Sequence, residues 1–181
     1  MIRLNLRRIL IALILTLGTS AVSLAQSLET QYYVAFFAYA PSIAGATPGH
    51  FMIAFGKEDA ELRQSIDEGV FGFYPQSSEA IAQKIISPNT EFVPGIIKSD
   101  RQKLLERELI EARLSVWVSQ AAYERAKAIK DEWESNTSYH LRNHNCVHFG
   151  HAIAKAIGLK LPKEVDATFP STYLEQLVEL N

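Results

Sequence analysis

The stretch NCVHFGHAIAKAIGLKLP, residues 145–162, decides where the chemistry of this chain can lie. Apolar side chains recur in it at helical spacing, which predicts an α-helix over residues 146–157. Gly158 stands in the C-cap position and Pro162 follows soon after, as is typical where a helix ends. The single cysteine of the chain, Cys146, is therefore expected in the first turn of this helix.

Four segments before this helix are expected to be strands, because they are short apolar stretches or alternate between apolar and polar residues. The first, QYYVAFFAY, suits a strand that is buried on both faces. The second begins at His50, directly after a loop rich in Gly and Pro at residues 41–49. The strands are expected at residues 31–39, 50–56, 66–74 and 111–118.

A second helix is expected immediately before the polar linker that leads to Cys146. Ser119 is a typical N-cap residue, and the apolar residues that follow are spaced to bury one side of a helix over residues 120–134. Residues 76–94 are less regular, and we expect a mixed loop there with a short helix near residues 79–85.

Cys146 and His50 are the residues most suited to nucleophilic chemistry. The unpaired backbone N–H groups and the dipole at a helix start favour a thiolate. A thiol nucleophile also needs a base within hydrogen-bonding reach, and a histidine at the start of a strand is held in a fixed place. The alternative interpretation is an inert core thiol together with a histidine that merely ends a loop.

Two motifs resemble those of circularly permuted NlpC-type papain-like proteins. Residues 145–149, NCVHF, with the helix after them, are similar to the cysteine motif of that group, and residues 48–51, PGHF, followed by GFYP at residues 72–75, to its histidine motif. In that group the histidine strand precedes the cysteine helix, as His50 precedes Cys146. The resemblance implies an α+β papain-like domain over residues 26–181, with an antiparallel sheet and the Cys-bearing helix packed on it.

The same resemblance implies a thiol hydrolase. Cys146 would be the nucleophile and His50 the general base, and the backbone N–H of Cys146 would help to hold the oxyanion. A polar residue on the following strand usually orients the histidine in this group. Gln64, Ser65, Asp67 and Glu68 lie near that place, and we select Asp67 because a carboxylate best stabilises an imidazolium.

A metal site is a rival interpretation of the region around Cys146. It holds four of the five histidines of the chain, and histidines at helical spacing can hold zinc or copper. On the expected helix, however, Cys146 shares its face with Phe149 and Ile153, whereas His148 and His151 point elsewhere. The four histidines are His140, His144, His148 and His151. We therefore expect no metal and no cofactor at Cys146.

The first residues of the chain indicate export. Arg3, Arg7 and Arg8 precede an apolar run at residues 9–17 and a small-x-small site that ends at Ala25, which is the layout of a cleavable signal peptide over residues 1–25. The run is shorter than the roughly 20 residues of a membrane-spanning helix. We expect a periplasmic or extracellular location, with no transmembrane segment after cleavage.

Charge and composition limit the classes of partner that the chain is expected to bind. Removing the three arginines of the signal peptide changes the net charge from −2 to about −5, which does not suit a nucleic-acid partner. The expected partner is an amide or peptide substrate, with peptidoglycan among the candidates, or an acyl lipid. Two alternatives remain open: a non-catalytic binding or structural domain of the same fold, and a metal-binding protein that uses the histidines. The oligomeric state is not indicated.

Overall fold

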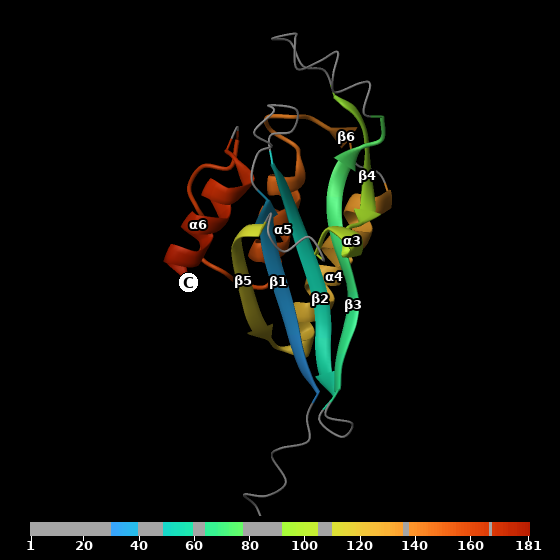
Figure 1. Cartoon of the computed structure of the whole chain (residues 1–181), viewed down its shortest axis with the longest axis vertical. Coiled ribbons are helices and arrows are strands. Elements are labelled where there is room, and N and C mark those ends of the chain that lie inside the picture. The colour runs from blue at the N-terminus through green and yellow to red at the C-terminus, as the bar shows by residue number, and fades with distance from the viewer. Residues whose placement is uncertain are drawn as a thin grey trace, which may run out of the picture.

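The computed structural model describes residues 30–39, 49–59, 64–77, 92–104, 110–135, 138–166 and 168–181. The expected signal peptide and the short helix expected near residues 79–85 lie outside these ranges. Within them the chain forms an antiparallel sheet with helices packed on it (Figure 1).

The sheet has the strand order β5-β1-β2-β3-β4-β6, and all neighbouring strands are antiparallel. The strand β2 lies in the middle of the sheet and begins at His50. This histidine therefore lies at one end of a central strand. The strands are β1 Gln31–Tyr39, β2 His50–Asp59, β3 Gln64–Pro75, β4 Val93–Ser99, β5 Ile110–Val118 and β6 Ser138–Tyr139.

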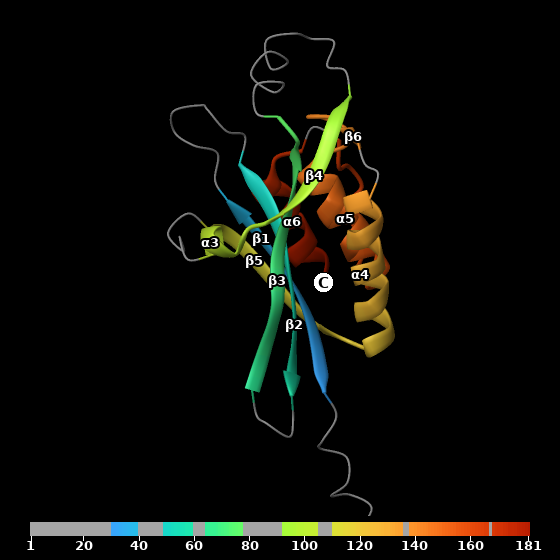
Figure 2. The same ribbon diagram turned by 90° about the vertical axis from the view of Figure 1, so that its right-hand side faces the viewer.

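Helices cover the sheet unequally (Figure 2). Three long helices pack on one face, with α5 against β2 and β3, and α6 against β1 and β5. The short helix α3 packs against β3 from the other side of the sheet. The helices are α3 Arg101–Leu104, α4 Gln120–Ser135, α5 Cys146–Ala156 and α6 Pro170–Leu180.

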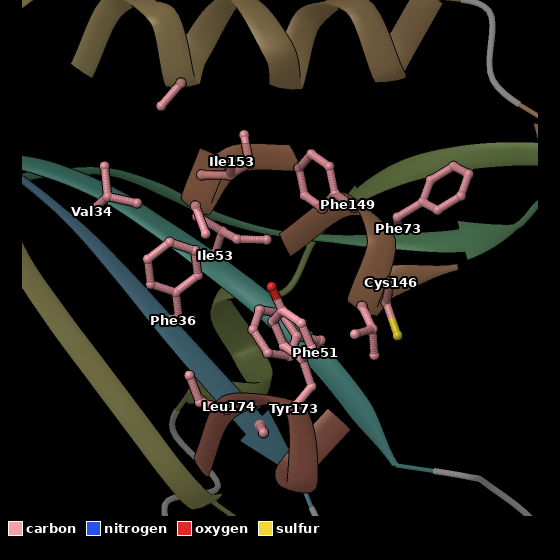
Figure 3. Packing of buried hydrophobic residues seen from close by; sticks show 14 of the residues in the cluster. Val34, Phe36, Phe51, Ile53, Phe73, Cys146, Phe149, Ile153, Tyr173 and Leu174 are labelled. Carbon is pink, nitrogen blue, oxygen red and sulfur yellow. The ribbon is translucent and has the colours of Figure 1, made fainter. Parts of the chain in front are cut away.

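The main core lies between the sheet and the long helices. It joins Phe36 and Phe51 of the central strands to Phe149 and Ile153 of α5, all of them inaccessible to solvent. Cys146 lies at the edge of this cluster, with its sulfur pointing away from Phe149 and Ile153 (Figure 3). The helix thus anchors its apolar side in the core and presents the thiol at the border of the core.

The structure confirms the α+β papain-like fold that the sequence predicts, with an antiparallel sheet and the Cys-bearing helix packed on it. β1 and β5 lie within one residue of the expected bounds, as do α4 and α5. Ser119 caps α4, since its hydroxyl oxygen accepts from the N–H of Ala122 at 3.3 Å. Gly158 follows α5 with a φ of 86°, the left-handed conformation that glycine adopts readily at a helix end.

None of the helices in the described ranges is long and apolar enough to cross a membrane.

Candidate active site

Cys146 is the first residue of α5, and its neighbour Asn145 fixes the start of that helix. The Asn145 side-chain oxygen accepts from the backbone N–H groups of Val147 at 2.9 Å and His148 at 3.4 Å. His148 completes a capping box, because its Nδ1 accepts from the N–H of Asn145 at 3.4 Å. The Asn145 oxygen takes up the second and third N–H groups of the helix, and not that of Cys146. The first N–H therefore remains a donor beside the thiol, at the positive end of the helix dipole.

His50 begins β2, and Asp100 follows β4 directly. The Nε2 atom of His50 lies 2.9 Å from Oδ2 of Asp100, and only 12% of the His50 side chain and 4% of that of Asp100 are exposed. The thiol of Cys146, also buried, lies close enough to the same imidazole to raise its pKa. The structure thus brings together Cys146 and His50, as the sequence predicts, and adds a carboxylate that the sequence analysis did not select.

Electrostatics at this site favour an ion pair. Burial lowers the pKa of His50, but the hydrogen bonds to Asp100 and Cys146 outweigh it, so this pKa lies above its ordinary value of 6.5. Burial also raises the pKa of Asp100, but contacts with His50 and Tyr74 and the charge of Lys103 bring it below its ordinary value of 3.8. At pH values between the lowered pKa of Asp100 and the raised pKa of His50, a charged aspartate therefore faces an imidazolium.

Gly72 of β3 is what allows His50 and Asp100 to meet. A Cβ atom at this position would lie 2.1 Å from Oδ2 of Asp100 and 2.2 Å from Nε2 of His50. Any other residue would therefore displace one of the two side chains. The two functional groups reach each other across β3 through the space that this glycine leaves open.

Tyr74, two residues farther along β3, holds the pair in place. Its ring stacks on the imidazole of His50, with centroids 4.3 Å apart, and its hydroxyl donates to Oδ1 of Asp100 at 2.6 Å. Burial and this hydrogen bond raise the pKa of Tyr74, which keeps the hydroxyl a neutral donor. The two carboxylate oxygens of Asp100 are thus used separately, one for His50 and one for Tyr74.

The selection of Asp67 as the orienting residue is corrected by the geometry. In the pairing of β2 with β3, Asp67 lies opposite Gly56. Gly56 is six residues from His50, about 20 Å along an extended strand. The carboxylate of Asp67 accepts instead from the N–H of Gly69 at 2.8 Å and pairs with Arg101 at 3.2 Å.

The histidines near Cys146 do not converge on one point. Within the described part of the chain, no group of three or more His, Cys, Asp or Glu side chains could hold a metal ion. Each imidazole contacts a different group: His140 the backbone N–H of Arg142, His144 the ring of Trp133, His148 the carboxylate of Asp166, and His151 the hydroxyl of Tyr173.

A cavity of about 380 Å³ opens beside Cys146. The turn before α5 forms one wall with Leu141 and Arg142, and the start of α6 forms another with Phe169 and Pro170. Its volume falls within the roughly 300–1,000 Å³ that is usual for small-molecule sites. The thiol therefore borders a space that can hold part of a substrate.

Asp100 and Tyr74 are the site residues that sequence reasoning missed. Asp100 follows the segment VPGIIKS, in which Pro94 and Gly95 weaken the strand pattern. It also precedes the helical residues of α3, which is a usual place for an aspartate as N-cap. Tyr74 lies within the GFYP segment that supports the family resemblance, but no role was assigned to it. An acid between an apolar run and a helix start was the available signal.

The ion pair between His50 and Asp100 should make the free energy of unfolding depend on pH. His50, with a raised pKa, contributes stability that is full below pH 6.5 and is lost as pH rises through the raised pKa. Asp100, with a lowered pKa, contributes stability that is full above pH 3.8 and is lost as pH falls through the lowered pKa. We expect Asp100→Asn to cost about 1.5 to 3 kcal/mol between these pH values, and less outside them.

Thermal unfolding of the wild type and the variant, from acid to mildly alkaline pH, measures this difference. Asp67→Asn is the matched control, because its half-exposed ion pair with Arg101 should contribute less than about 1 kcal/mol at any pH. A difference for Asp100→Asn that is constant with pH would contradict the ion pair.

Comparison with known proteins gives a likeness at the level of the fold. No protein-family model matches the chain, and no curated protein matches it. A crystal structure described as the type VI secretion system effector TseH is similar, with a TM-score of 0.51 and 16% sequence identity, covering 83% of this chain and 88% of that chain. At such low identity the likeness concerns the fold alone. The chain is thus similar in architecture to a type VI secretion system effector.

Proposed function

We propose that this chain is an exported thiol hydrolase that cleaves an amide or peptide bond through an acyl-enzyme on Cys146. One observation carries the proposal: the imidazole of His50 has its Nε2 2.9 Å from Oδ2 of Asp100 and lies close enough to Cys146 for that residue to raise its pKa. A nucleophile, a base and a group that orients the base are the three parts that such catalysis needs.

The first half of the reaction forms a thioester. Because Nε2 of His50 engages Asp100, Nδ1 is the nitrogen assigned to the thiol, and it takes the proton from Sγ of Cys146. The thiolate attacks the carbonyl carbon, and the carbonyl oxygen becomes an oxyanion beside the backbone N–H of Cys146. The C–N bond then breaks, and the amine leaves with the proton from Nδ1.

The second half restores the enzyme. The neutral imidazole of His50 takes a proton from a water molecule, and the resulting hydroxide attacks the thioester carbonyl. The C–S bond breaks, the acyl group leaves as a carboxylic acid, and the proton returns to the Cys146–His50 pair. Throughout, Asp100 and Tyr74 hold the ring in one orientation.

The order of the motifs supports a permuted NlpC-type assignment, because the histidine strand β2 precedes the cysteine helix α5. The signal-peptide layout of residues 1–25 supports export of a single domain over residues 26–181. The similar structure is described as a secretion-system effector, which suits a protein that acts outside its own cytoplasm. Peptide bonds of peptidoglycan are therefore the first substrate class to test, and acyl lipids the second.

The proposal is tested by trapping the intermediate. The exported protein is purified, incubated briefly with peptidoglycan peptides or acyl lipids, quenched in acid and analysed by mass spectrometry. We expect the mass of the free protein to correspond to a chain that begins near Gln26. We also expect an acyl adduct on Cys146 and released product. Cys146→Ala should give neither adduct nor product.

Binding of a peptide or lipid by both proteins, without adduct or turnover, would contradict the proposal. It would favour instead a non-catalytic binding domain of the same fold.

A further inference from the structure

The cavity beside Cys146 combines apolar walls with a single charged side chain. Apolar surface comes from Leu141, Val147, Phe169 and Pro170, and the one charged residue among the lining residues is Arg142, which is exposed. An apolar cavity with one fixed polar group is the arrangement that orients a ligand. The charge therefore bears on which substrates can occupy the site.

The turn that carries Arg142 is held rigidly. The Nδ1 atom of His140 accepts from the backbone N–H groups of Arg142 and Asn143, both at 3.3 Å. The side-chain amide of Asn145 donates to the carbonyl oxygen of Leu141 at 2.6 Å. On either side of the turn, His140 and His144 exchange two backbone hydrogen bonds of 2.8 and 3.0 Å. The base of the Arg142 side chain is thus fixed relative to Cys146, three residues beyond Asn143.

Charge at the site favours an anionic group near Arg142. No ion pair joins Arg142 to a carboxylate in the described ranges. The carboxylate of Asp166, on the segment before the opposite wall, contacts His148, with Oδ1 2.8 Å from Nε2. The positive end of the α5 dipole adds to the potential of the guanidinium. Lys103 is paired with Asp100, with Nζ 3.5 Å from Oδ1, so its charge is already used there.

We propose that Arg142 is a specificity-determining residue that binds a carboxylate of the substrate. The enzyme then acts on amides or peptides in which an apolar group and a free carboxylate, terminal or side-chain, flank the scissile bond. A guanidinium suits this role because its planar set of N–H donors matches the geometry of a carboxylate. This inference rests on the proposed function, since it names the substrate class of the same site.

Two thiol reagents of nearly equal shape test the proposal on the purified full chain. N-phenylmaleimide and N-(4-carboxyphenyl)maleimide carry the same apolar ring and differ in one carboxylate, and both label Cys146 as the single cysteine. We measure the ratio of the two labelling rates, so that general changes in thiol reactivity cancel. Arg142→Gln should lower the preference for the carboxylate reagent by about threefold to tenfold, and Arg142→Lys should retain part of it.

Arg113→Gln is the matched control, because Arg113 is an exposed arginine on β5 that is not among the cavity-lining residues. This variant should leave the ratio unchanged. An equal ratio in Arg142→Gln and the wild type, with fast labelling of both, would overturn this inference and leave the proposed function intact. Folded protein that reacts with neither reagent would overturn both, because the cavity would then not give access to the thiol.

Discussion

Replacing Gly72 by alanine is expected to remove most of the reactivity of Cys146 while the chain stays folded. The new Cβ would lie 2.1 Å from Asp100 and 2.2 Å from His50, and the atoms it meets are the ends of side chains rather than backbone. The two side chains can move aside but can no longer meet, so the variant should lose at most about 1.5 to 3 kcal/mol, the value expected for their pairing, and stay folded. Alkylation of Cys146 by iodoacetamide near pH 6.5 should slow by about tenfold or more, because the sulfur loses its oriented imidazole.

Gly56→Ala is the matched control for this result. Gly56 lies on the neighbouring strand β2, and a Cβ there would lie 2.2 Å from the ring of Tyr33, at a place distant from Cys146. This variant should displace the tyrosine ring and leave the alkylation rate close to that of the wild type. Equal rates in Gly72→Ala and the wild type would show that the contact between His50 and Asp100 does not matter for the thiol.

His50→Ala is expected to have the larger effect on the thiol. The thiolate is the nucleophilic form of a cysteine, and His50 is the base that the proposed mechanism assigns to the proton of the Cys146 thiol. We therefore expect alkylation near pH 6.5 to slow by about tenfold to hundredfold. The difference should shrink as pH approaches about 9, where solvent deprotonates most thiols without help.

His151→Ala controls for the loss of a histidine close to the cysteine. His151 lies on the same helix α5 but contacts the hydroxyl of Tyr173 at 3.0 Å. Its replacement should leave the pH profile of alkylation unchanged. A similar loss in both variants would mean that the rate reports general loosening of α5 rather than an effect of His50.

Much of the fold was predictable because its elements carry strong local signals. β1 is rich in aromatic residues, and α5 has both an apolar stripe and a glycine stop. The elements that were missed have weaker patterns. β4 contains Pro94 and Gly95, and β6 spans two residues, so tertiary pairing rather than local sequence makes them strands. The helix α6 begins with Pro170 in its first turn, which is a typical start signal for a helix.

The site was predictable only in part, because the meeting of Asp100 with His50 depends on strand register. The family resemblance places the orienting residue on the strand after His50, and Asp67 was selected there because a carboxylate best stabilises an imidazolium. The pairing of β2 with β3, however, places Gly72 rather than Asp67 near His50. The carboxylate then comes from beyond β4, one strand farther across the sheet. Neither register nor the empty space above a glycine can be read from a single sequence.

The central claim is that the fold activates Cys146 as a nucleophile, and one measurement tests it most directly. The rate of iodoacetamide alkylation near pH 6.5 is measured for the folded wild-type chain and for the same chain unfolded in urea. We expect the folded protein to react about tenfold faster or more, because only the folded chain places His50 and Asp100 beside the sulfur. A thiol that reacts only after unfolding would contradict this account and identify Cys146 as a structural residue at the edge of the core.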